Sequence, residues 1–148
     1  MSPIFYWDAN AFIGLLEASP KEREPLARMW VHAEAGRIEI ITSTMTIAEV
    51  LVLPFKNGDG RLLQAYGSLL GKGGLARLVE TSTAVWLEAA TNRALLNLKL
   101  ADAVHLATAR RENAKALISA DKRLPSGSKV VIVNPQSAEM DQLLSSLE

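Results

Sequence analysis

Four acidic residues of this 148-residue chain stand where they would be able to do chemistry together. Asp8 and Asp121 each follow directly after a short apolar run, and Glu49 and Asp102 each interrupt an otherwise apolar stretch. A carboxylate with apolar flanks is costly to desolvate unless a partner compensates its charge. These four residues are therefore the candidates for a functional site.

Clustered carboxylates favour a metal ion as the compensating partner. Acids that lie close together raise one another's pKa, so proteins rarely gather them without a cation. No lysine or arginine adjoins Asp8, Glu49 or Asp102 in the sequence. The chain has no cysteine and only two histidines, His32 and His105, so oxygen atoms would have to hold the ion. Mg²⁺ and Mn²⁺ prefer oxygen ligands, and they activate water for attack on a phosphodiester.

Each acid also has a structural interpretation. Asp8 and Asp121 follow predicted strands, where an aspartate commonly caps the next helix. Asp102 is near the start of a predicted helix, where a negative charge interacts favourably with the helix dipole. Glu49 fits a partly exposed surface position. These interpretations explain the acids one at a time, whereas a shared metal site explains all four.

Short apolar runs separated by segments of helical periodicity predict an alternating order of strands and helices. A proline lacks the backbone N–H that continues a helix, so Pro54 is predicted to end the helix that contains Glu49. The predicted strands span residues 3–7, 38–42, 75–80, 116–120 and 130–133. The predicted helices span residues 10–16, 20–35, 45–53, 61–70, 83–97 and 100–112.

The predicted strands are apolar on both faces, which is typical of a parallel sheet covered by helices on both sides. The sequence therefore predicts a single domain, residues 1–148, with a three-layer α/β/α sandwich around a mostly parallel sheet of about five strands. Ligands of such folds bind outside the carboxyl ends of the strands. Asp8 and Asp121 are therefore expected to open onto one crevice at that edge.

Four segments of the chain resemble the successive signatures of PIN domains, in the same order. The resemblance spans nearly the whole chain. Its third segment is the most specific, because it is similar to toxins of the VapC type over ten residues. The four segments are Tyr6–Ile13, Thr46–Leu51, Leu100–Ala109 and Leu117–Lys122.

This resemblance implies that the four acids are catalytic ligands of Mg²⁺ or Mn²⁺ in a metal-dependent endoribonuclease. Asp8, Glu49 and Asp102 would be the principal ligands. Asp121 would complete the site directly or through water. In this reading the ion activates water for in-line attack on the RNA phosphodiester, and no residue serves as a covalent nucleophile.

The resemblance also implies supporting residues and partners. Asn10 and Ser119 fall where the family often has a small polar residue that supports the acids. A VapC-like protein would cleave a structured RNA, such as transfer RNA or a ribosomal RNA loop. It would act as the toxin of a type II toxin–antitoxin pair, form a homodimer, and have its acidic cleft covered by a small antitoxin.

Other residues near the acids have two interpretations each. His105 lies three residues, about one helical turn, after Asp102. We favour a packed, hydrogen-bonded histidine over a catalytic one. Lys122 and Arg123 would either contact substrate phosphates or be solvated residues of a turn. The glycine-rich stretch 54–78 matches no signature of the family. It would be either a clip that contacts RNA or a partner, or a surface excursion.

Composition constrains the setting more than the activity. The net charge of zero provides no overall attraction for a polyanion. Residues 91–130 hold eight basic and three acidic residues, so this stretch would form either a local basic surface or ordinary solvated helix faces. The N-terminus lacks the pattern of a signal peptide, and no segment approaches the length of a membrane span. Together with the missing cysteines, this predicts a cytoplasmic protein that does not enter a membrane.

Two other functions are compatible with the sequence. A PIN-type domain that binds RNA or a partner without cutting is compatible with the neutral net charge. A phosphoryl-transfer enzyme of the haloacid dehalogenase or receiver type would share a similar sheet. The segment Asp8-Ala9-Asn10 argues against the latter, because it lacks the second aspartate that such a phosphatase usually has.

Overall fold

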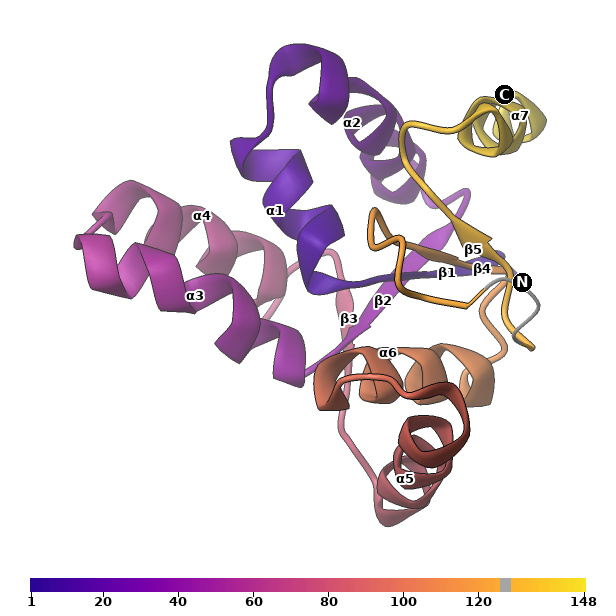
Figure 1. The fold of residues 1–148 in the computed structure, drawn as a ribbon. Coiled ribbons are helices and arrows are strands. Elements are labelled where there is room, and N and C mark those ends of the chain that lie inside the picture. The colour runs from indigo at the N-terminus through magenta and orange to yellow at the C-terminus, as the bar shows by residue number, and fades with distance from the viewer. Residues whose placement is uncertain (126–128) are drawn as a thin grey trace.

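The computed structural model describes residues 1–125 and 129–148 and has a five-stranded sheet at its centre (Figure 1). The strands are β1 (Ile4–Trp7), β2 (Glu39–Ser43), β3 (Arg77–Val79), β4 (Ala116–Ile118) and β5 (Ile132–Val133). The helices of the described residues are α1 (Ala9–Glu17), α2 (Pro20–Glu34), α3 (Met45–Asn57), α4 (Gly60–Leu70), α5 (Thr83–Leu96), α6 (Leu100–Arg111) and α7 (Ala138–Leu147).

The strand order is β3-β2-β1-β4-β5, and all neighbouring strands are parallel. The predicted α/β sandwich with a parallel sheet is therefore confirmed. β1 and β4 are neighbours, with Trp7 in register with Ile118. The residues that follow these two strands, Asp8 and Ser119, consequently leave the sheet side by side at its carboxyl edge.

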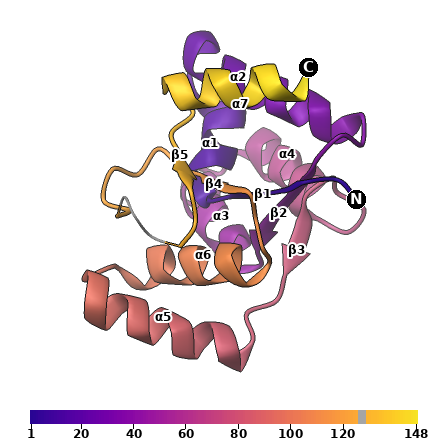
Figure 2. The ribbon, with the colours of Figure 1, turned by 90° about the vertical axis from the view of Figure 1, so that its right-hand side faces the viewer.

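The two faces of the sheet bury different side chains because successive residues of a strand point to opposite sides. Phe5 and Trp7 of β1 pack into one core with helices α1, α2, α3, α4 and α7, whereas Tyr6 packs into a second core with α5 and α6. Figure 2 shows α5 and α6 stacked on one side of the sheet, with α2 and α7 on the other. The protein thus has the three layers expected.

The prediction that Pro54 ends its helix is wrong. Pro54 lies inside α3, which continues to Asn57. A proline removes one backbone hydrogen bond of the helix, and here its ring is buried, which compensates part of that loss. The helix ends instead at Gly58, whose left-handed φ of 59° is a conformation that glycine adopts without strain.

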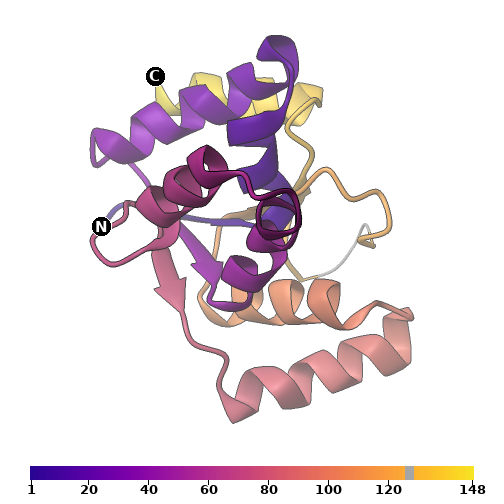
Figure 3. The ribbon, with the colours of Figure 1, turned by 90° about the vertical axis from the view of Figure 1, so that its left-hand side faces the viewer.

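Helix α4 follows at once and packs on α3, so that the two helices form an antiparallel pair on one side of the molecule (Figure 3). The glycine-rich stretch 54–78 is therefore largely helical. Helix α7 was not predicted, although Ser137 caps it by accepting a hydrogen bond from the backbone N–H of Met140 (3.2 Å). Met140 and Leu144 of α7 are buried in the same core as the apolar side chains of α2, and the two helices are in contact.

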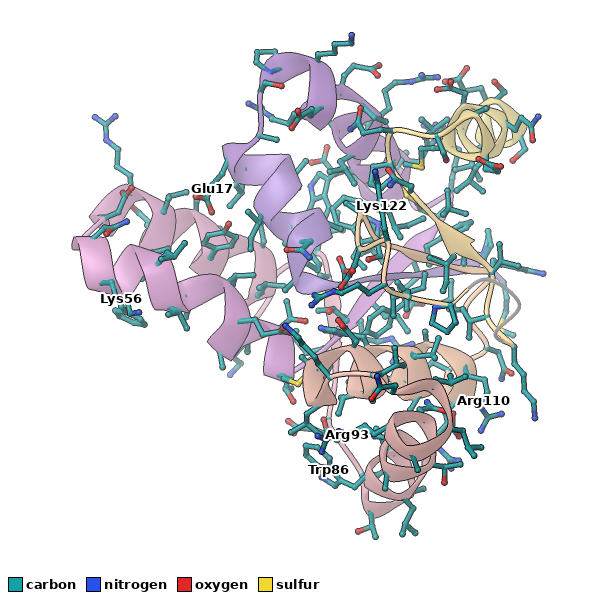
Figure 4. All side chains as sticks on the ribbon, in the orientation of Figure 1. Glu17, Lys56, Trp86, Arg93, Arg110 and Lys122 are labelled. Carbon is teal, nitrogen blue, oxygen red and sulfur yellow. The ribbon has the colours of Figure 1, made fainter. Side chains whose placement is uncertain are left out.

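Several apolar side chains remain exposed on α3 and α5. Phe55 of α3 has 65% of its surface exposed, and Leu95 of α5 has 78%. Trp86 and Arg93 of α5 are exposed as well (Figure 4). Among residues 1–125 and 129–148, no helix is long and apolar enough to cross a membrane.

Candidate active site

The four predicted site residues come from four separate parts of the fold. Asp8 follows β1 and caps α1, and Asp121 follows β4 in the loop that leads toward β5. Glu49 lies in the first half of α3, and Asp102 lies in the first turn of α6. The parallel sheet directs the first two to its carboxyl edge, and the crossover helices bring the other two toward the same edge.

Asp8 is the most buried of the four acids, with 4% of its surface exposed. Its Oδ1 accepts a hydrogen bond from the backbone N–H of Ala11 (2.9 Å), as the structural interpretation of a helix cap requires. Its Oδ2 accepts a hydrogen bond from the hydroxyl of Ser119. Burial raises the pKa of the Asp8 carboxyl above its ordinary value. The two hydrogen bonds lower this pKa, but their effect is smaller than that of burial. Asp8 is therefore both a cap and a buried carboxylate that gains from a nearby cation.

Ser119 connects two of the acids. Its hydroxyl donates to Asp8 and accepts from the backbone N–H of Asp121 (3.0 Å). This single side chain therefore ties the loop after β4 to the loop after β1. Asn10, the other residue expected to support the acids, is exposed in the first turn of α1 and lines a shallow hollow with Ala120.

Asp102 and Asp121 form a second acidic pair, whose charge Arg123 compensates in part. Burial and then the negative charge of Asp121 raise the pKa of Asp102. The guanidinium of Arg123 donates to both carboxylate oxygens of Asp121 (3.0 and 2.9 Å) and lies 3.8 Å from Asp102. These hydrogen bonds lower the pKa of Asp121. Arg123 is thus an ion-pair partner of the acids in this structure, which neither interpretation of the turn had specified.

Glu49 is held by a histidine. The Nε2 of His105 lies 2.7 Å from Oε1 of Glu49, and its Nδ1 lies 2.5 Å from the hydroxyl of Tyr6. His105 is 2% exposed, which agrees with the packed, hydrogen-bonded histidine that we favoured. Sequence reasoning missed Tyr6. The available signal was that a tyrosine in a buried strand needs a partner for its hydroxyl.

The charges of the acids act on one another across these elements. The carboxylate of Glu49 contributes to the raised pKa of Asp8, and Asp121 contributes to that of Asp102. Ser119 joins the loops of Asp8 and Asp121, and Arg123 lies against both Asp121 and Asp102. The four acids therefore belong to one electrostatic neighbourhood at the edge of the sheet.

The donor set fits a hard divalent cation, although the side chains do not form a ready-made cage. Within residues 1–125 and 129–148, no three His, Asp or Glu side chains are grouped closely enough to hold an ion as they stand. Each of three acids is instead held by a protein donor: Asp8 by Ser119, Glu49 by His105, and Asp121 by Arg123. Carboxylate oxygens are the ligands that Mg²⁺ and Mn²⁺ prefer, and a cation would relieve the raised pKa values.

Comparison with known proteins places the chain in a family. The sequence matches the PIN domain family over residues 5–129, which is most of the chain. No curated protein matches the sequence.

Solved structures share the fold at low sequence identity. A toxin–antitoxin complex from Klebsiella pneumoniae has 24% identity and a TM-score of 0.68, covering 92% of this chain and 99% of that one. FitAcB from Neisseria gonorrhoeae has 19% identity and a TM-score of 0.67, covering 88% and 97%. VapC20 from Mycobacterium tuberculosis, a sarcin–ricin loop cleaving toxin, has 15% identity and a TM-score of 0.62, covering 76% and 86%.

Proposed function

Because this chain belongs to the PIN domain family, we propose that it is a metal-dependent endoribonuclease that hydrolyses RNA phosphodiester bonds and acts as the toxin of a type II toxin–antitoxin pair. The observation that carries the proposal is that shared partners tie acids from four separate elements together. Ser119 joins Asp8 to the loop of Asp121, and Arg123 lies against both Asp121 and Asp102. His105, on the same helix as Asp102, contacts Glu49. A structural role explains each acid alone, but it does not explain why burial and neighbouring acids raise the pKa of two of them.

The catalytic metal ligands of this proposal are Asp8, Glu49, Asp102 and Asp121, and the ion is Mg²⁺ or Mn²⁺. When bound, the ion would supply Lewis acidity for attack of water on the phosphorus and would offset the charge on the leaving oxygen. Ser119 would hold Asp8 and the loop of Asp121 in fixed positions relative to each other. Asn10 would act at the rim of the site, where it is exposed.

Arg123 would have to release Asp121 and Asp102 for a cation to bind between them. Its side chain is 59% exposed, so it is able to turn outward at small cost. There, with Lys122, it would lie beside the scissile phosphate as a counter-charge to the RNA backbone. Arg123 would thus pair with the acids in the free protein and with the RNA backbone in the complex.

The substrate and partners of the proposal follow from analogy with the structural neighbours. PIN domains are generally nucleases, and VapC20 is described as a toxin that cleaves the sarcin–ricin loop. A structured RNA, transfer RNA or ribosomal RNA, is therefore the proposed substrate. An antitoxin is the proposed partner, since the Klebsiella neighbour is a toxin–antitoxin complex. A homodimer is proposed as well, because exposed apolar residues such as Phe55, Trp86 and Leu95 would gain from burial.

Cleavage of total cellular RNA by the purified protein tests the proposal. The reaction is compared in Mg²⁺, Mn²⁺ and EDTA, with Asp102→Asn in parallel to control for a contaminating nuclease. We expect discrete fragments that require the ion and a loss of at least about 100-fold in rate in the variant. Asp141→Asn, an exposed acid in α7, is the matched control and should cleave as the wild type does.

Either of two results would contradict the proposal. Fragments that persist in EDTA or in Asp102→Asn would rule out the assigned metal site. Tight RNA binding without cleavage in either ion, by a folded protein free of antitoxin, would favour a PIN-type domain that binds RNA without cutting it.

A further inference from the structure

A buried hydrogen-bonded chain runs from the sheet to the candidate site. The backbone N–H of Ser43 lies 3.1 Å from the hydroxyl of Tyr6, and that hydroxyl lies 2.5 Å from Nδ1 of His105. The opposite ring nitrogen of His105, Nε2, lies 2.7 Å from Oε1 of Glu49. The chain therefore joins β2, β1, α6 and α3 in that order.

The direction of the hydrogen bonds in this chain follows from its acceptor end. An ionised Glu49 carboxylate has no proton to donate, so it accepts from Nε2–H of His105. A neutral ring with its proton on Nε2 has a bare Nδ1, which accepts from the hydroxyl of Tyr6. The Tyr6 oxygen accepts in turn from the backbone N–H of Ser43.

The packing holds the chain in place. Tyr6 has 0% and His105 2% of its surface exposed, and their ring centroids lie 5.5 Å apart in an edge-to-face arrangement. Tyr6 belongs to the core between the sheet and the α5–α6 pair, in which the neighbours of His105 along α6 are also buried. Neither ring has room to turn without disturbing that core.

Glu49, by contrast, has a long side chain that is 30% exposed. A free glutamate at such a position samples many rotamers, and ordering it for a ligand costs side-chain entropy. The fixed Nε2–H of His105 removes much of that freedom by holding Oε1, which leaves Oε2 for a cation. Both ring nitrogens of His105 are then engaged by protein groups, so the histidine acts on the site through Glu49.

We propose that Tyr6 and His105 are positioning residues, which select one histidine tautomer and thereby preset the Glu49 carboxylate for a divalent cation. This inference rests on the proposed function, because it assigns Glu49 as a metal ligand. Tyr6 of β1, which is not itself a metal ligand, would then help to determine the metal affinity. Outer groups that orient a metal ligand typically change affinity by about 10–100-fold.

The substitution Tyr6→Phe tests the inference, since it removes one oxygen atom and preserves the ring. Two measurements are made: the nitrogen chemical shifts of the histidine rings by NMR, which distinguish the two neutral tautomers from the protonated ring, and Mn²⁺ affinity by calorimetry without RNA. The chain has two histidines, and His32, whose Nδ1 accepts from Arg37 (2.8 Å), serves as the internal reference.

The control variant is Tyr66→Phe. Tyr66 is equally buried, at 1% exposure, and its hydroxyl donates to the carboxylate of Glu17 between α4 and α1. Glu17 lies on the side of the molecule away from α6 (Figure 4). This variant therefore removes the hydroxyl of another buried tyrosine, and its part-buried hydrogen bond, without touching the chain that ends at Glu49.

We expect wild-type His105 to show the Nε2–H tautomer and Tyr6→Phe to show a mixture, with His32 unchanged and Mn²⁺ binding about tenfold weaker. Tyr66→Phe should bind Mn²⁺ as the wild type does. His105→Gln, which keeps an N–H for Glu49, should bind Mn²⁺ more tightly than His105→Leu, which has none.

The outcomes separate this inference from the proposed function. Equal Mn²⁺ affinity in wild type and Tyr6→Phe, or an Nδ1–H tautomer in the wild type, overturns the positioning role and leaves the nuclease proposal standing. Failure of the wild type itself to bind Mn²⁺ or Mg²⁺ overturns the metal site, and the positioning role with it.

Discussion

Arg123 and Asp121 form a two-pronged ion pair in which the guanidinium donates to both carboxylate oxygens, at 3.0 and 2.9 Å. The same guanidinium lies 3.8 Å from Asp102. Two of the four candidate ligands therefore already share a cation that the chain itself supplies. A metal ion would compete with Arg123 for these oxygens.

Removing that internal cation should strengthen metal binding. We expect Arg123→Gln to bind Mn²⁺ about 2- to 5-fold more tightly than the wild type, because an exposed ion pair is only a weak competitor for the metal. Calorimetry without RNA measures this directly. Lys122→Gln removes the same charge from the adjoining exposed position, and an equal gain there would show that only the overall charge matters.

Asp8 should limit the stability of the metal-free protein. Burial raises its pKa in the folded state, so the ionised carboxylate destabilises the fold as the pH rises through that value. Asp8→Asn keeps a helix cap and removes the charge. We expect the melting temperature at neutral pH in EDTA to rise by about 2–4 °C, equivalent to about 1 kcal/mol.

This gain should shrink as the pH falls, because the wild-type carboxyl becomes protonated and neutral too. Thermal unfolding at a series of pH values follows the effect. Asp141→Asn, at an exposed position, should show no such gain. A lower melting temperature for Asp8→Asn at neutral pH would contradict the electrostatic cost assigned to Asp8.

Metal should stabilise the wild type through the same residue. Mn²⁺ at about 100 times its dissociation constant contributes about 2.7 kcal/mol by mass action. That corresponds to a rise of about 5–10 °C in melting temperature for a chain of this size. Asp8→Asn should lose this shift, and an undiminished shift in the variant would mean that the ion binds elsewhere.

As the pH is lowered, metal affinity should begin to fall at a higher pH than it does at a site of ordinary carboxylates. Asp8 and Asp102 both have raised pKa values, so protons compete with the ion at a higher pH, whereas Asp121, with its lowered pKa, does not limit binding. Titrations with Mn²⁺ at pH values between about 5 and 8 would check this. Constant affinity over that range would contradict the raised values.

The sequence was sufficient to predict the sheet and where its acids lie. Asp8 and Asp121 follow apolar runs, and the physics of a parallel sheet requires that such residues emerge at one edge. The order of elements could be predicted because strand and helix periodicities are local patterns. Pro54 was misjudged for the complementary reason: whether a helix continues through a proline depends on the burial of the ring, which is a tertiary property.

The partners of the acids were decided by tertiary structure alone. Nothing in the spacing of Tyr6, Glu49 and His105 relates them, yet three elements bring their polar atoms within hydrogen-bond distance. Ser119 and Asp8 meet across 111 residues only because β1 and β4 are neighbours. The sequence by itself determined which residues carry charge and which strands are buried, since these depend on residue type and local pattern. Which group faces which charge depends on contacts between distant segments, and those exist only once the chain has folded.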